Sequence, residues 1–131
     1  KLAICTDVFA DLSYTDMLDK VKSLGIDAVE MTAGGWGARK HCNTAELLAD
    51  EGKRKEFMGE LEKRGMRISA LNTSCNPLWP SKTGEEYKKS MYDCATLAGL
   101  LGVKKIVAMA GHHPELDHLY RFLAGFHGSG V

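Results

Sequence analysis

One short pattern occurs three times in this chain and restricts its possible folds more than any other feature. A helix-like stretch ends at a glycine, and an apolar run follows, at Gly25, Gly65 and Gly102. Glycine adopts the left-handed conformation that commonly ends a helix without steric cost. The runs that follow are short and mostly apolar, which is typical of buried parallel strands. Each glycine is therefore predicted to end a helix and lead into a strand.

The stretches between these glycines have helical spacing and helix-start signals. Ser13 to Asp16 fits an S-x-x-D capping box, in which the serine hydroxyl accepts a hydrogen bond from an early helical N–H group. Asn43 or Thr44 can cap a second helix, and Thr83 opens a further capping box. The predicted strands cover residues 1–6, 26–31, 66–71 and 103–109, and a last helix is predicted near residues 114–123.

Strands that alternate with helices predict an α/β fold with a parallel sheet and right-handed crossovers. The length of 131 residues suits one core, so we expect a single (β/α)4-type domain over residues 1–131, with an atypical tail over 114–131. Two architectures fit this pattern. One is a small open sheet of flavodoxin type, and the other is about half of a (β/α)8 barrel, which needs roughly 250 residues when complete.

Composition excludes several classes of partner. Seventeen basic residues balance seventeen acidic ones, so we expect no broad surface for nucleic acid or anionic membranes. No apolar run approaches the roughly 20 residues that span a bilayer. The cysteines form no C-x-x-C pair, which favours a reducing, cytoplasmic setting over a disulfide framework. They are Cys5, Cys42, Cys75 and Cys94.

The predicted carboxyl ends of the strands are where ligands bind in either architecture. The loops there are rich in polar and aromatic residues, whereas the opposite turns contain little besides helix stops. Amides, hydroxyls and a carboxylate suit a polyhydroxylated ligand, and tryptophan offers an apolar face to a sugar ring. The candidate substrate-binding residues are Glu30, Trp36, His41, Asn72, Asn76 and His112.

Each candidate also has a structural interpretation. Glu30 could form an ion pair, Trp36 could cover the core, and His41 could be an exposed loop residue. Asn72 and Asn76 could stabilise turns through bonds to the backbone.

Other loop residues allow further interpretations. One of the adjacent residues His112 and His113 could bind a metal, and Asp7 could serve a turn or a substrate. The "GGWG" stretch is interpreted as a flexible substrate loop. No G-x-S-x-G, P-loop or G-x-G-x-x-G motif is present, so the catalytic residues stay unassigned.

Several segments in one order resemble the xylose-isomerase-like barrel family, in its sugar isomerase and epimerase branch. They are "KLAICTDVFADLS", "LGIDAVEM", "HCNTAELLAD", "RISALNTSCNPLWP" and "LGVKKIVAMAG", which together reach residue 111. The resemblance implies a (β/α)8 barrel that binds a divalent metal, Mn, Mg, Co or Zn, and moves a proton between adjacent carbons through an enediol. Such an ion acts as a Lewis acid on substrate oxygens.

The same resemblance implies that the family's Glu, Asp, His and Glu metal ligands come from the second half of the barrel, so no metal ligand is assigned here. It carries over the substrate-facing residues Glu30, Trp36, His41, Asn72 and His112. We therefore expect the N-terminal half of a sugar or sugar-phosphate isomerase or epimerase. The expected partners are that small-molecule substrate and either a second copy or a missing barrel half.

Three other functions stay open. The first alternative is a non-catalytic carbohydrate-binding or assembly half-barrel. A polyol dehydratase and an endonuclease-like relative are lesser alternatives, and the neutral charge disfavours the endonuclease because phosphate contacts require basic residues.

Overall fold

The structure is a computed structural model that describes residues 2–114. The predicted last helix and the tail, which extend beyond residue 114, lie outside the described residues. Four strands form one parallel sheet in the order β1-β2-β3-β4. The strands are β1 (Ile4–Cys5), β2 (Ala28–Thr32), β3 (Arg67–Asn72) and β4 (Ile106–Val107). The helices are the 3-10 helix η1 (Thr6–Phe9), α1 (Tyr14–Ser23), α2 (Thr44–Ala49), α3 (Glu51–Glu62) and α4 (Lys82–Leu101).

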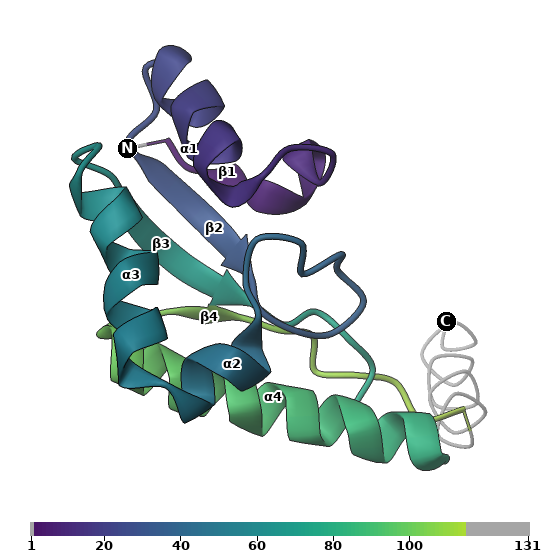
Figure 1. The fold of residues 1–131 in the computed structure, drawn as a ribbon. Helices are drawn as coiled ribbons and strands as arrows, with labels where there is room; N and C mark the ends of the chain where they lie inside the picture. The colour runs from purple at the N-terminus through teal and green to yellow at the C-terminus, as the bar shows by residue number, and fades with distance from the viewer. Residues whose placement is uncertain (1, 115–131) are drawn as a thin grey trace, which may run out of the picture.

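The strand order decides between the two architectures that the sequence left open. Each strand pairs with the next one along the chain (Figure 1). A flavodoxin-type sheet has the order 2-1-3, whereas a barrel adds its strands consecutively. The sheet therefore has the order of four consecutive strands of a (β/α)8 barrel. Because right-handed crossovers that all advance in one direction place their helices on one face, the other face corresponds to the inside of a barrel.

The three glycine signatures are confirmed, and they share one hydrogen-bond pattern. All three glycines have positive φ: +76° at Gly25, +61° at Gly65 and +70° at Gly102. In each case the apolar residue that follows donates its backbone N–H to the carbonyl five residues back, as in a Schellman motif. These bonds are Ile26 to Val21 (3.4 Å), Met66 to Leu61 (2.9 Å) and Val103 to Ala98 (2.9 Å). The apolar residue after each glycine thus anchors the helix end to the core.

Two of the three predicted helix starts are confirmed, and one is wrong. Ser13 caps α1 by accepting from the Asp16 N–H at 3.1 Å, and Asn43 caps α2. Helix α4, however, begins at Lys82, with the Ser81 hydroxyl accepting from the Thr83 N–H at 3.2 Å. Thr83 lies inside the helix because Ser81 already satisfies its N–H group.

The edge strands are shorter than predicted. Strand β4 has two residues where the sequence predicted 103–109, because it pairs only with the end of β3, through Leu71 and Asn72. Strand β1 ends at Cys5, where the chain turns into η1. The core lies between the sheet and the helices and is formed mainly by Met17, Leu18, Val21, Val29, Met31, Leu61, Leu71, Cys94 and Leu97. Among the helices that the structure describes, none is long and apolar enough to cross a membrane.

Candidate functional site

Glu30 and Asn72 meet at the carboxyl ends of two neighbouring strands. The Asn72 side-chain NH2 donates to Glu30 Oε1 at 2.6 Å, and Asn72 Oδ1 accepts from the backbone N–H of Ser74 at 2.8 Å. Both side chains are half-buried. The amide is therefore held at both ends, and its orientation follows from the Ser74 N–H group, which can only donate.

A β-bulge brings these two side chains to the same face. Val29 pairs with Ile68, but Glu30 pairs with Ala70, so Ser69 is the extra residue. The Ser69 hydroxyl donates to the Val29 carbonyl at 2.9 Å. Side chains of a regular strand alternate between the two faces of a sheet. Without the bulge, Asn72 would therefore face the helices, as Ile68 of the core does. The bulge reverses the phase, so that Leu71 packs in the core and Asn72 faces inward with Glu30.

The first strand brings further polar groups to this edge. Cys5 is the register partner of Glu30, and its sulfur lies 3.8 Å from the Thr32 hydroxyl. The buried Thr6 hydroxyl accepts from the Thr32 N–H at 3.3 Å. Asp7 lies against the loop that follows β2, since a Cβ at Gly37 would be 2.7 Å from its carboxylate. The loops after β1 and β2 thus form one packed surface.

The "GGWG" loop is closely packed, which contradicts the prediction of a flexible loop. The Gly35 N–H donates to the Ser90 hydroxyl of α4 at 2.9 Å, and the Trp36 N–H donates to the Ser74 carbonyl at 3.0 Å. A Cβ at Gly35 would lie 2.2 Å from that same carbonyl oxygen. The glycines let this loop approach the neighbouring backbone closely. Trp36 remains 56% exposed, with its ring edge-on to Tyr87 at 6.2 Å.

His41 and Asn76 have structural contacts. His41 is buried, and its Nε2 lies 3.1 Å from the Leu12 carbonyl, so this nitrogen carries the proton. Asn76 donates to the His112 carbonyl and accepts from the His112 N–H, both at 2.7 Å. Asn76 therefore fastens the loop after β4 to the loop after β3. His112 is exposed, and its backbone is held by the Asn76 side chain.

No metal site forms among the described residues. Within residues 2–114, no group of three or more His, Cys, Asp or Glu side chains could hold an ion. Glu30 is one carboxylate, and Asn72 already occupies one of its oxygens. This part of the chain therefore does not fit the ligand set of a resident divalent metal.

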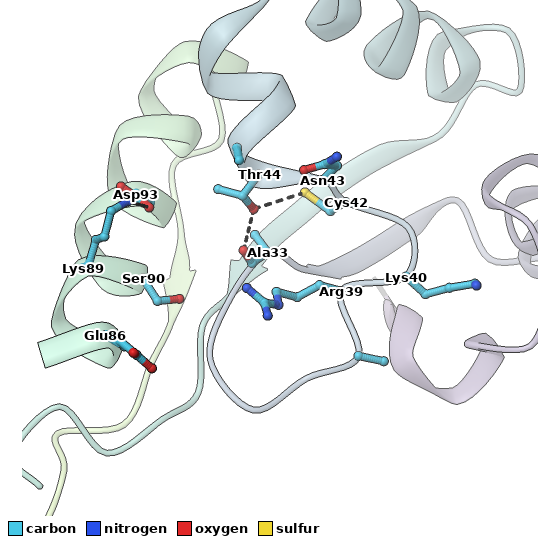
Figure 2. Close-up of a pocket in the computed structure, with 12 residues that line it drawn as sticks. Ala33, Arg39, Lys40, Cys42, Asn43, Thr44, Glu86, Lys89, Ser90 and Asp93 are labelled. Carbon is cyan, nitrogen blue, oxygen red and sulfur yellow. Dashed lines mark hydrogen bonds and ion pairs between the residues drawn. The ribbon is translucent and has the colours of Figure 1, made fainter. Parts of the chain in front are cut away.

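A cavity that sequence reasoning missed lies between the loop after β2 and helix α4. It has a volume of about 720 Å³. Figure 2 shows Arg39 of the loop and Glu86 of α4 on its two sides, while Lys40 points away. Arg39 has a φ of +50°, unusual for a residue other than glycine. Lys89 forms an ion pair with Asp93 in the same wall. No sequence motif marks these residues, because they come together only through the packing of loop and helix.

Comparison with known proteins shows the family. The chain matches the family of xylose isomerase-like TIM barrels over residues 18–126, and it belongs to that family. It is 48% identical over 111 residues to the uncharacterised Bacillus subtilis (strain 168) protein YfiH, covering 85% of this chain and 36% of that protein.

A solved structure agrees with the fold. The crystal structure of AsbF, described as the probable 3-DHS dehydratase involved in petrobactin synthesis from Bacillus anthracis, matches with a TM-score of 0.59 at 21% identity. The match covers 85% of this chain and 38% of AsbF. The chain therefore spans well under half the length of either relative, and the likeness to AsbF concerns the fold alone.

Proposed function

We propose that this chain forms the substrate-binding part of a sugar or sugar-phosphate isomerase or epimerase. One observation carries the proposal. The Glu30 carboxylate and the Asn72 amide meet on the inner face of the sheet, at the carboxyl ends of adjacent strands. Barrels of this kind bind their ligands there. An acceptor and a fixed amide in a half-buried position suit the hydroxyl groups of a sugar.

The proposed reaction moves a proton between adjacent carbons through an enediol. A divalent ion, Mn, Mg, Co or Zn, would supply the Lewis acid in the complete barrel. Residues 2–114 offer no ligand set for that ion. The role proposed for this chain is therefore to bind and orient the hydroxylated part of the substrate, with Glu30 as the acceptor and the exposed ring of Trp36 as an apolar surface.

Dehydration of a polyol is a second candidate function. Its support is the likeness in fold to AsbF, whose description names a dehydratase. A non-catalytic carbohydrate-binding half-barrel is a third candidate, because no three His, Cys, Asp or Glu side chains among the described residues are grouped so that they could hold a metal ion.

We also propose a partner and a compartment. Strands β1 and β4 are free edges within residues 2–114, so the chain would pair with the remaining strands of a barrel or with a second copy. All four cysteines are free, which supports a reducing, cytoplasmic setting.

Exchange of a substrate proton with solvent tests the proposal. The protein, in the assembly in which it is isolated, is incubated in D2O with Mn2+ and D-fructose, D-xylulose or D-ribulose 5-phosphate. We expect deuterium at the carbon next to the carbonyl, and about tenfold less in Glu30→Gln, which loses one bond to a charged acceptor. The matched control Asn43→Ser should not change the exchange, because serine also caps a helix and Asn43 makes its side-chain bond to the Glu46 N–H.

The outcomes separate the candidate functions. Saturable binding without exchange would favour the carbohydrate-binding function. Loss of water from one of these sugars, without isomerisation, would favour the dehydratase. Neither binding nor exchange with any of these sugars would contradict all three.

A further inference from the structure

The contacts of Glu30 leave one carboxylate oxygen available. Oε1 accepts from Asn72 at 2.6 Å. Among residues 2–114, Oε2 has no hydrogen-bond partner, and no Lys, Arg or His forms an ion pair with Glu30. The free oxygen can only accept while the carboxylate is ionised.

The orientation of Asn72 is fixed by a group outside the pair. The Ser74 backbone N–H donates to Asn72 Oδ1 at 2.8 Å, so the NH2 group must face Glu30. A reversed amide would place its NH2 group against the Ser74 N–H and its oxygen against the carboxylate. Both contacts would be repulsive, so the backbone after β3 determines which way the carboxylate is held.

Charge decides what can approach this pair. An ionised carboxylate without a neighbouring cation repels a phosphate or carboxylate group, because like charges interact unfavourably at short range. A hydroxyl group can instead donate to Oε2 in a charge-assisted hydrogen bond. The nearest register neighbours of Glu30 are Cys5 and Ala70, and neither supplies a positive charge.

We infer that Glu30 and Asn72 form a specificity pair that binds a neutral hydroxyl of the substrate and keeps any anionic end away from β2 and β3. Glu30 contacts the substrate, and Asn72 is a positioning residue that acts through Glu30. This inference rests on the proposed function. It adds that a sugar phosphate would bind with its hydroxylated carbons, and not its phosphate, at these strand ends.

The pair can be tested first without a ligand. The Asn72 side-chain NH2 signals, assigned by NMR in the full chain, should move when Glu30 is replaced by Gln. The Asn43 side-chain signals should not move, because Asn43 accepts from the Glu46 N–H and is not bonded to Glu30 or Asn72. Unchanged Asn72 signals in Glu30→Gln would contradict the pairing itself.

Calorimetry then tests the specificity. The probes are D-fructose, D-fructose 6-phosphate and inorganic phosphate, and the proteins are the unchanged chain, Glu30→Gln, Asn72→Ala and the control Asn43→Ser. We expect D-fructose to bind about tenfold more weakly to Glu30→Gln, and more weakly also to Asn72→Ala, with Asn43→Ser unaffected. Inorganic phosphate should not compete with D-fructose in the unchanged chain and should compete better in Glu30→Gln.

Failure of the inference differs from failure of the proposed function. If the unchanged chain binds D-fructose and both variants bind it equally well, the specificity pair is wrong and the proposed function stands. Competition by phosphate in the unchanged chain would also overturn the pair. If the unchanged chain binds neither sugar, both the inference and the sugar-binding function are overturned.

Discussion

The glycines of this chain serve two different purposes. Gly25, Gly65 and Gly102 end helices where an added Cβ would press on no backbone, with only the Lys22 side chain at 4.0 Å from that of Gly65. Gly35 instead lies where the loop after β2 meets the backbone after β3, and a Cβ there would be 2.2 Å from the Ser74 carbonyl oxygen. Its φ is also positive, at +70°. Gly35 therefore holds the loop that carries Trp36 against the candidate site.

Replacement of Gly35 by Ala should destabilise the fold. The new Cβ would press against the Ser74 carbonyl, and the left-handed conformation would be strained, so we expect a loss of about 1–3 kcal/mol in the free energy of unfolding. Gly59→Ala is the control, because Gly59 lies inside α3 with no atom within 4 Å of its Cβ position. It should stabilise the fold by about 1 kcal/mol. Urea unfolding measures both, and an equal effect of the two substitutions would contradict the packing of the loop.

The buried thiols predict a loss of stability at alkaline pH. Burial is the main cause that raises the pKa of Cys42 and of Cys94 from 9.0 to about 11. In the unfolded chain these thiols ionise near pH 9, whereas the folded chain keeps them protonated until about pH 11. Unfolding then releases protons, so the free energy of unfolding should fall as the pH rises from about 9 to about 11 and should not change through these groups below pH 9.

The control for this prediction is a Cys42→Ala, Cys94→Ala double variant. Its stability should decline less between pH 9 and 11 than that of the unchanged chain in urea unfolding. If the free energy of unfolding falls with pH equally steeply in the two proteins, burial does not keep these thiols protonated.

Residue types alone predicted part of the candidate site. Glu30 and Asn72 were expected at the strand ends and do meet there. His41 lies in the loop after β2, where the sequence placed it, but its side chain is buried against the Leu12 carbonyl. The sequence alone does not distinguish a polar loop residue that can bind a ligand from one that packs against the protein. The packing partner decides between these two roles, and that partner comes from a distant part of the chain.

At the scale of elements, helix ends follow the sequence more closely than strand ends. The Schellman-type endings at all three glycines come from local hydrogen bonds, so a local pattern predicts them. Strand length depends on the neighbouring strand, and β4 is short because it pairs only with Leu71 and Asn72, the last two residues of β3. The bulge at Ser69 is likewise invisible in the sequence, although it decides that Asn72 faces inward.

The start of α4 gives a direct test at this scale. Ser81→Ala removes the hydroxyl that accepts from the Thr83 N–H, and it should cost about 1 kcal/mol of stability. Thr83→Ala should cost close to nothing, because Thr83 is exposed and already helical. Thermal unfolding followed by circular dichroism measures both. The reverse ranking would favour the capping box that the sequence suggested at Thr83.

At the scale of the whole molecule, the sheet has exposed apolar side chains along β4 and after it. Ile106, Val107 and Met109 are 41%, 37% and 46% exposed. Strand β4 is also a free edge within residues 2–114. Free edges and apolar surface favour association with another chain or with further strands.

The particle mass in solution tests this feature. One copy of the chain has a mass of 14.3 kDa, and we expect light scattering to give at least twice that value. Val107→Lys places a charge on the free edge and should shift the particles toward the single-copy mass. A single-copy mass for the unchanged chain would mean that the exposed residues of β4 do not drive association.

Chemical-shift mapping tests whether the inner face at the ends of β2 and β3 binds a hydroxylated ligand. D-fructose is titrated into the isotope-labelled chain, and the backbone amide signals are followed. We expect saturable changes first at Glu30, Asn72 and Ser74, which share the hydrogen bonds of the pair. Changes confined to Arg39 and Glu86 at the cavity beside α4, or no changes at all, would contradict it.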